Sequence, residues 1–148
     1  MSEKGIVTLE RVLPYAPQDV WRALTEPALL AKWWAPGDVR PIVGHRFTLD
    51  MGEFGQQPCQ VLAVEPETMM AYSFSDGTID ASMPWRLDST ITWRLEPQGT
   101  GTRLCLEHAG FDLDSPIGRR GYEGMGAGWP HVLARIEDAL IAAGPGTP

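Results

Sequence analysis

Three histidines and a glycine-rich stretch are the first features of this chain that could support chemistry. His45, His108 and His131 stand far apart, and none belongs to an HxH or HExxH pattern, so the sequence offers no recognisable metal site. Four glycines between residues 121 and 128 lack the lysine and the preceding strand that a phosphate-binding loop requires. We therefore expect no metal, no cofactor and no assignable catalytic residue.

The two cysteines, Cys59 and Cys105, are the remaining nucleophilic candidates. They lie far apart within strand-like segments, and no CxxC spacing suggests metal or redox work. Disulfides are rare in cytosolic proteins, and a free cysteine is among the most buried residue types. We expect both to be buried, reduced thiols.

Two polar side chains fall on faces that are otherwise apolar. His108 alternates in phase with two leucines that precede it, which directs its ring toward the core. Tyr72 shares a face with Met70 and Phe74 in the same way. For each side chain two interpretations stay open: a hydrogen-bonded place in the core, or a hydrogen bond to the polar end of a ligand.

The elements that must position these residues begin with a strand and two short helices. β-branched residues over 5–13 predict the strand, which Pro14 ends. Apolar residues at helical spacing then predict helices over 17–25 and 27–34, because a proline stands at the first position of each.

From residue 44 the apolar period changes to two, which predicts an antiparallel meander of about five strands with short connections. Residues 52–58 are expected to form a turn, and residues 78–86 have no clear period and predict a longer loop. The expected strands cover residues 46–51, 60–65, 70–75, 90–96 and 103–108.

The last predicted element is an amphipathic helix. Trp129, Leu133 and Ile136 step by +4 and +3 and so share one helix face. Pro130 and the preceding glycines disfavour helix, so we expect only a weak or kinked lead-in over 117–128 and firm helix after Pro130. This helix is the only element large enough to cover the apolar face of the sheet, which makes the fold class α+β.

Composition limits the functions further. The 148 residues fit one domain, residues 1–148, and 43% apolar with 21% charged residues is typical of a globular protein. A net charge of -7 without a basic cluster opposes nucleic-acid binding. No apolar run approaches the ~20 residues of a membrane span, and the first residues lack a signal-peptide pattern, so we expect a cytoplasmic protein.

A curved sheet bridged by one helix tends to leave an apolar pocket, typically of roughly 300–1,000 Å³. Each of the six tryptophans is more often a core residue than a ligand contact, yet some of them are expected to line such a pocket. Strand and helix phase predict these lining residues: Trp33, Phe47, Leu49, Met51, Tyr72, Phe74, Trp93, Leu106, His108, Trp129, Leu133 and Ile136.

Four segments carry a resemblance to a known family: residues 20–27 (VWRALTEP), 32–36 (KWWAP), 108–111 (HAGF) and 128–129 (GW). With them the chain, from about residue 6 to residue 140, resembles the heat-shock-protein-90 ATPase activator homologue-like (AHSA-type) family of the START-like, helix-grip (SRPBCC) superfamily. Pro130 departs from the polar residue that is more common in that family at this position.

The resemblance implies a helix-grip fold, in which a curved antiparallel sheet wraps around a long C-terminal helix above a deep cavity. Relatives bind lipids, polyketides and other apolar molecules, and some are cyclases. The eukaryotic namesakes are stress-response co-chaperones with an additional N-terminal domain, which we do not expect here. The family has no universal catalytic set to carry over.

Taken with the inward aromatic residues, this favours a non-catalytic protein that binds a small hydrophobic ligand. One alternative is a cyclase- or hydrolase-like enzyme acting on a bound polyketide or aromatic substrate, with His108 as a proton carrier. Another is a co-chaperone-like protein-interaction module. The expected partner is a small apolar molecule, neither nucleic acid nor membrane, and a homodimer is left open.

Overall fold

Six strands and three helices make up the described part of the chain. The structure is a computed structural model that describes residues 4–50, 56–73, 89–113 and 116–143. In chain order the elements are β1 (Lys4–Leu13), α1 (Pro17–Thr25), α2 (Pro27–Trp33), β2 (Arg46–Asp50), β3 (Gln56–Glu65), β4 (Met69–Ser73), β5 (Thr90–Gln98), β6 (Gly101–Asp112) and α3 (Pro116–Ala143).

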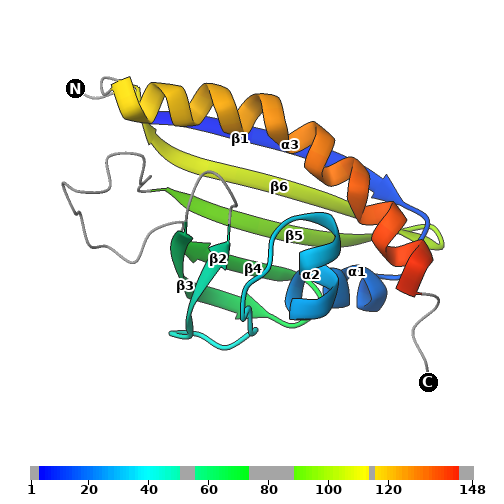
Figure 1. The fold of residues 1–148 in the computed structure, drawn as a ribbon. Coiled ribbons are helices and arrows are strands. Elements are labelled where there is room, and N and C mark those ends of the chain that lie inside the picture. The colour runs from blue at the N-terminus through cyan, green and yellow to red at the C-terminus, as the bar shows by residue number, and fades with distance from the viewer. Residues whose placement is uncertain (1–3, 51–55, 74–88, 114–115, 144–148) are drawn as a thin grey trace.

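The strands form one antiparallel sheet in the order β1-β6-β5-β4-β3-β2. Strands β2 to β6 follow one another as the predicted meander, and β1 closes the far edge beside β6. Figure 1 shows α3 lying along β1 and β6 on one face of the curved sheet, and α3 also packs against α2. The α+β helix-grip fold expected from the sequence is confirmed.

The alternation predicted for the strands decides which side chains face α3. On β6, Leu104, Leu106 and His108 are buried, whereas Arg103 and Glu107 lie on the opposite face. We call the buried side of the sheet, which faces α3, the inner face.

Prolines start both short helices, as predicted. Pro17 and Pro27 occupy first positions where their missing N–H groups cost no hydrogen bond. Trp34, which we expected to end the second helix, instead follows it with non-helical φ and ψ angles of -132° and -83°.

Residues 117–128, expected to form a weak or kinked lead-in with firm helix only after Pro130, belong to the helix throughout, because α3 is assigned without a break from Pro116 to Ala143. Pro130 removes only one backbone hydrogen bond and lies at the exposed side of the helix. Packing supports the first half of the helix: the Tyr122 ring covers Gly5 of β1, and a Cβ on Gly126 would lie 3.7 Å from Val7. Tertiary contacts of this kind outweigh local helix propensity.

The turn expected over residues 52–58 is also wrong at its end, because β3 begins at Gln56 and pairs Pro58 with Thr48. The backbone N–H of Gln60 points toward β4, where it donates to Ser73 Oγ. The nitrogen of Pro58, two residues earlier, faces the same side, and the described part of β4 ends at Ser73. The proline therefore breaks no pairing in the described sheet.

The cysteine prediction is confirmed for one thiol and wrong for the other. Cys59 is fully buried, and its burial raises the pKa of the thiol well above the ordinary value. Cys105 lies on the outer face and is only half-buried, because it alternates out of phase with Leu104 and Leu106. Both thiols are free.

Candidate functional site

Five residues form a row across the inner face of the sheet. The strand registers place Val7 on β1, His108 on β6, Ile91 on β5, Tyr72 on β4 and Val61 on β3 next to one another. All of them are buried. Three members of this row are apolar, so His108 and Tyr72 are the groups in it that can form directional bonds.

A glycine bulge follows His108 on β6. Gly110 has a φ of 100°, a conformation that glycine adopts without strain, and the pairing of β1 with β6 shifts by one residue beside it. The bulge shifts the register two residues beyond the histidine, and the pairing with β1 resumes at Phe111 and Asp112.

His108 is held on both ring nitrogens. Trp129 on α3 donates from Nε1 to Nδ1 of His108 over 3.0 Å, and Oγ of Ser89 lies 2.7 Å from Nε2. The imidazole is 0% exposed. Since an indole N–H can only donate, Nδ1 is the accepting nitrogen.

The charge of His108 follows from its burial. Desolvation lowers the pKa of the imidazole from 6.5 to about 3, so the ring is neutral at physiological pH. A neutral ring that accepts at Nδ1 carries its proton on Nε2, and this proton is donated to Ser89 Oγ. In this arrangement His108 cannot accept a proton from Ser89, although the pair is as close as a nucleophile and its general base would be.

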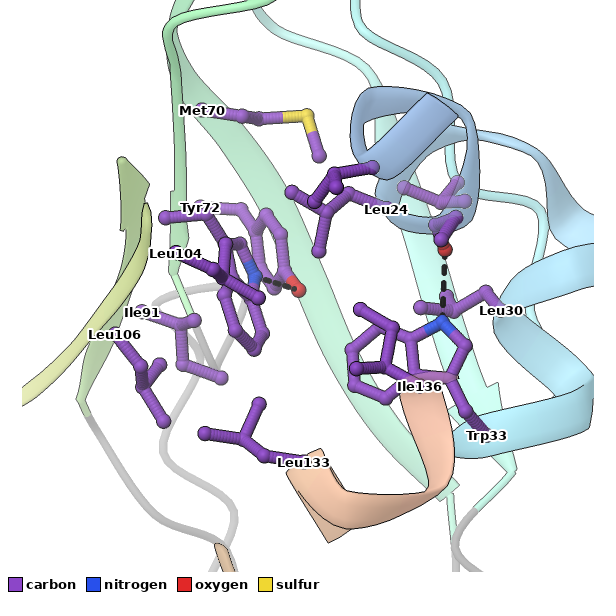
Figure 2. Close-up of a cluster of buried hydrophobic side chains, with 14 of the residues drawn as sticks. Leu24, Leu30, Trp33, Met70, Tyr72, Ile91, Leu104, Leu106, Leu133 and Ile136 are labelled. Carbon is purple, nitrogen blue, oxygen red and sulfur yellow. Dashed lines mark hydrogen bonds between the residues drawn. The ribbon is translucent and has the colours of Figure 1, made fainter. Parts of the chain in front are cut away.

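Tyr72 takes part in a second buried pair. Nε1 of Trp93 donates to the Tyr72 hydroxyl oxygen over 2.9 Å, and Figure 2 shows this bond as a dashed line. Burial raises the pKa of the phenol well above its ordinary value, so the hydroxyl keeps its proton. Figure 2 shows the Tyr72 side chain directed from the sheet toward Leu24 and Ile136, which enter from the helices.

Four tryptophans, from α2 and the residue that follows it, from β5 and from α3, pack together. Trp93 lies edge-on to Trp33 and to Trp129, with ring centroids 5.7 and 5.6 Å apart. Trp34 lies 5.0 Å from Trp129. The Trp33 indole also donates to the carbonyl of Ala23 over 2.8 Å, which ties α2 to α1. At this level a ring from α3, Trp129, is in contact with a ring from the sheet, Trp93.

The structure brings most of the predicted lining residues together. Met51 and Phe74 lie outside the described residues. The other ten are buried, nine in one hydrophobic cluster and His108 joined to it by Trp129: Trp33, Phe47, Leu49, Tyr72, Trp93, Leu106, His108, Trp129, Leu133 and Ile136. Their placement on the inner face agrees with strand and helix phase, and a role in lining a ligand cavity stays a prediction.

Two residues of the site were missing from that prediction. Ser89 precedes β5 and shares the inner face with Ile91 and Trp93, so extending the period-two pattern by one step would have found it. Trp34 is placed by the non-helical end of α2, for which the sequence gives no signal.

The described residues support neither a metal site nor a membrane-spanning helix. Among the residues described, no three His, Cys, Asp or Glu side chains gather where they could hold a metal ion. Within those same residues, every helix is too short or too polar to cross a membrane.

Comparisons with known proteins place the chain in a family. The family model described as "Activator of Hsp90 ATPase homolog 1-like protein" matches residues 14–140. Among solved structures, protein MLL2253 from Mesorhizobium loti is 36% identical, with a TM-score of 0.80 over 94% of this chain and 98% of that chain. No curated protein matches the chain at a significant level.

Two more distant structures share the fold alone. DynU16, described as a protein in the dynemicin biosynthetic locus, is 20% identical, with a TM-score of 0.76; the match covers 95% of this chain and 49% of that one, so this chain spans about half of DynU16. Aha1 from Colwellia psychrerythraea, solved as a dimer in solution, is 18% identical, with a TM-score of 0.74 over 91% of this chain and 95% of that one.

Proposed function

This chain belongs to the Activator of Hsp90 ATPase homolog 1-like family, and from that membership we propose that it binds a small hydrophobic molecule between its sheet and α3. The observation that carries the proposal is the character of the inner face. Its aromatic rings surround groups that are polar but uncharged, His108 and Tyr72. Such a surface suits an apolar molecule that has a few polar atoms.

The position of α3 supports a particular place for the ligand. The helix packs along β1 and β6, while Tyr72 and Val61 lie on strands farther across the sheet. Trp129 and Trp93 already meet between helix and sheet. We therefore place the ligand beside this contact, over Ile91 and Tyr72, where apolar burial would supply most of the affinity.

A cyclase- or hydrolase-like enzyme is the second candidate, and the fold that the chain shares with DynU16, a protein in the dynemicin biosynthetic locus, is compatible with it. A hydrolase mechanism with Ser89 as the nucleophile is disfavoured by the tautomer of His108. Its Nε2 donates a hydrogen bond to Ser89 and therefore cannot take the hydroxyl proton as a general base. The alternative of a co-chaperone-like interaction module rests on the family description. The proposal of a homodimer rests on Aha1 of C. psychrerythraea, which was solved as a dimer.

The free thiols Cys59 and Cys105 favour a reducing, cytoplasmic location.

The test is ligand binding measured by two signals. Diphenylmethane, benzophenone and palmitic acid would be titrated while the melting temperature and the tryptophan emission are recorded. At least one probe should raise the melting temperature, because a ligand at 100 times its Kd stabilises the folded state by about 2.7 kcal/mol. The same probe should change the emission, because the tryptophans Trp93 and Trp129 lie beside the proposed site.

Two variants separate a specific site from surface binding. Ile91→Ala alters the centre of the inner-face row and should change the affinity of the probe. Leu62→Ala alters a side chain that is 49% exposed on the outer face, and it should leave the affinity unchanged. The proposal fails if no probe changes either signal, or if the two variants behave alike.

A further inference from the structure

Two buried hydroxyl groups of the site, on Tyr72 and Ser89, each carry a proton for which the described residues provide no acceptor. An indole N–H has no acceptor capacity, so the oxygen of Tyr72 must accept from Trp93. Its own proton must then go to another atom. Among the described residues, no acceptor lies within hydrogen-bond distance of this proton.

The hydroxyl oxygen of Ser89 also accepts a hydrogen bond, in this case because of the bond between Trp129 and His108. Trp129 forces Nδ1 of His108 to accept, so Nε2 carries the ring proton and the Ser89 oxygen accepts it. The hydroxyl proton of Ser89 is again left over, and the described part of the chain provides it with no acceptor. Ser89 is 4% exposed, so bulk water does not compensate readily.

The two residues that carry these hydroxyls are neighbours on the inner face of the sheet. Tyr72 pairs with Ile91 across β4 and β5, and Ser89 stands two residues before Ile91. Tyr72 and Ser89 are therefore diagonal neighbours, for which Cβ atoms lie about 7–8 Å apart. One small molecule can span that distance.

We infer that the ligand is a neutral, apolar molecule that carries carbonyl or ether oxygens, and that the hydroxyls of Tyr72 and Ser89 donate hydrogen bonds to these oxygens. This inference rests on the proposed binding function and narrows it to a ligand class. A carboxylate or phosphate is disfavoured, because the buried polar side chains among the described residues, Thr25, Gln57, Ser89, Thr102 and His108, are all uncharged. A pure hydrocarbon would offer neither proton an acceptor.

A matched pair of probes tests the inference. Benzophenone and diphenylmethane have the same two rings and differ by a carbonyl in place of a methylene group. The native protein should bind benzophenone roughly two- to tenfold more tightly, the effect of one neutral hydrogen bond. Equal affinity for the two would overturn the inference while leaving the hydrophobic-binding proposal intact. Binding of palmitic acid without binding of either ring compound would likewise overturn the inference alone, whereas failure of all three probes would overturn the binding proposal and the inference with it.

Substitutions then locate the donor. The variants Tyr72→Phe, Ser89→Ala and the double variant remove the hydroxyls. Tyr15→Phe serves as the control because Tyr15 stands in the connection between β1 and α1 and does not belong to the inner-face row. The preference for benzophenone should fall in at least one single variant and disappear in the double variant. A preference that survives in the double variant would overturn the assignment.

A spectroscopic measurement on the native protein keeps the test independent of whether the variants fold. Benzophenone labelled with ¹³C at the carbonyl gives an infrared band that moves to lower frequency when the oxygen accepts a hydrogen bond. In the complex the band should lie below its position in a hydrocarbon solvent. A band at the hydrocarbon position would mean that neither Tyr72 nor Ser89 donates to the ligand, and the inference would be wrong.

Discussion

Trp129 donates its indole hydrogen to Nδ1 of His108, and this single bond between α3 and β6 fixes the tautomer of the buried imidazole. The bond also joins the helix to the sheet at the level where the tryptophan rings meet. The chemistry of the site and the docking of α3 therefore depend on the same pair of side chains.

The first prediction concerns that tautomer. Long-range ¹⁵N–¹H spectra of the native protein at pH 7 should show His108 neutral, with its proton on Nε2, because Nδ1 accepts from Trp129. Trp129→Phe removes the donor and should cost about 1–3 kcal/mol of unfolding free energy, since Nδ1 is left buried without this bond.

Trp33→Phe is the matched control for this experiment. It also deletes a buried indole hydrogen bond, the one to the Ala23 carbonyl, but it does not touch His108. It should lower stability by a similar amount and leave the His108 signals in place. A proton found on Nδ1 in the native protein would contradict the assigned roles of Trp129 and Ser89.

The second prediction is a pH dependence of stability. Burial lowers the pKa of His108 to about 3 in the folded state, against 6.5 when it is exposed. Between these values the unfolded chain binds the extra proton, so stability is fully present above pH 6.5 and falls as the pH decreases toward 3. At pH 5 the loss from this group should be about 2 kcal/mol.

Urea unfolding of the native protein, His108→Gln and His131→Gln at pH 7.5 and pH 5 checks this dependence. His131 is exposed on α3, so its replacement should keep the native difference between the two pH values. His108→Gln should show a difference smaller by about 2 kcal/mol. Identical differences in all three proteins would show that His108 is not held neutral by burial.

The sequence predicted His108 as an inward residue because side chains alternate strictly along a strand. It could not predict the bond to Trp129, since that bond depends on how α3 is rotated and where it crosses the sheet. Ser89 was missed because it borders a segment without a clear period. Local pattern therefore determined which face a residue occupies, while its partner depended on contacts between elements distant in sequence.

The expectation of a weak or kinked lead-in before Pro130 underestimated the helix for the same reason. Glycine and proline lower local helix propensity, and the sequence offers no measure of the packing that opposes this. In the structure Tyr122 lies against Gly5, and Gly126 lies next to Val7, so the segment is supported by β1. The short helices were predicted well because Pro17 and Pro27 are local signals.

The third prediction concerns the pair Tyr72 and Trp93. Tyr72→Phe leaves the buried Trp93 N–H without its acceptor and should lower the unfolding free energy by about 1–3 kcal/mol. Trp93→Phe combined with Tyr72→Phe removes both partners, so the double variant should lose less than the sum of the two single variants. Chemical denaturation of the four proteins measures this coupling, and strictly additive losses would mean that the bond contributes nothing.

The fourth prediction compares two glycines that differ in the space available for a side chain. A Cβ on Gly124 of α3 would meet nothing within 4 Å, whereas a Cβ on Gly5 of β1 would lie 2.5 Å from the Tyr122 ring. Gly124→Ala should therefore stabilise the protein by about 0.5–1 kcal/mol, because alanine raises helix propensity and restricts the unfolded chain.

Gly5→Ala should instead destabilise the protein by about 1–3 kcal/mol, because the new methyl group displaces the Tyr122 ring from β1. Adding Tyr122→Leu to Gly5→Ala should recover part of that loss, since the smaller side chain leaves room for the methyl group. Thermal unfolding of the single and double variants measures both effects. If Gly5→Ala were harmless, the first half of α3 would not lie against β1, and the support that keeps the helix continuous before Pro130 would have to come from elsewhere.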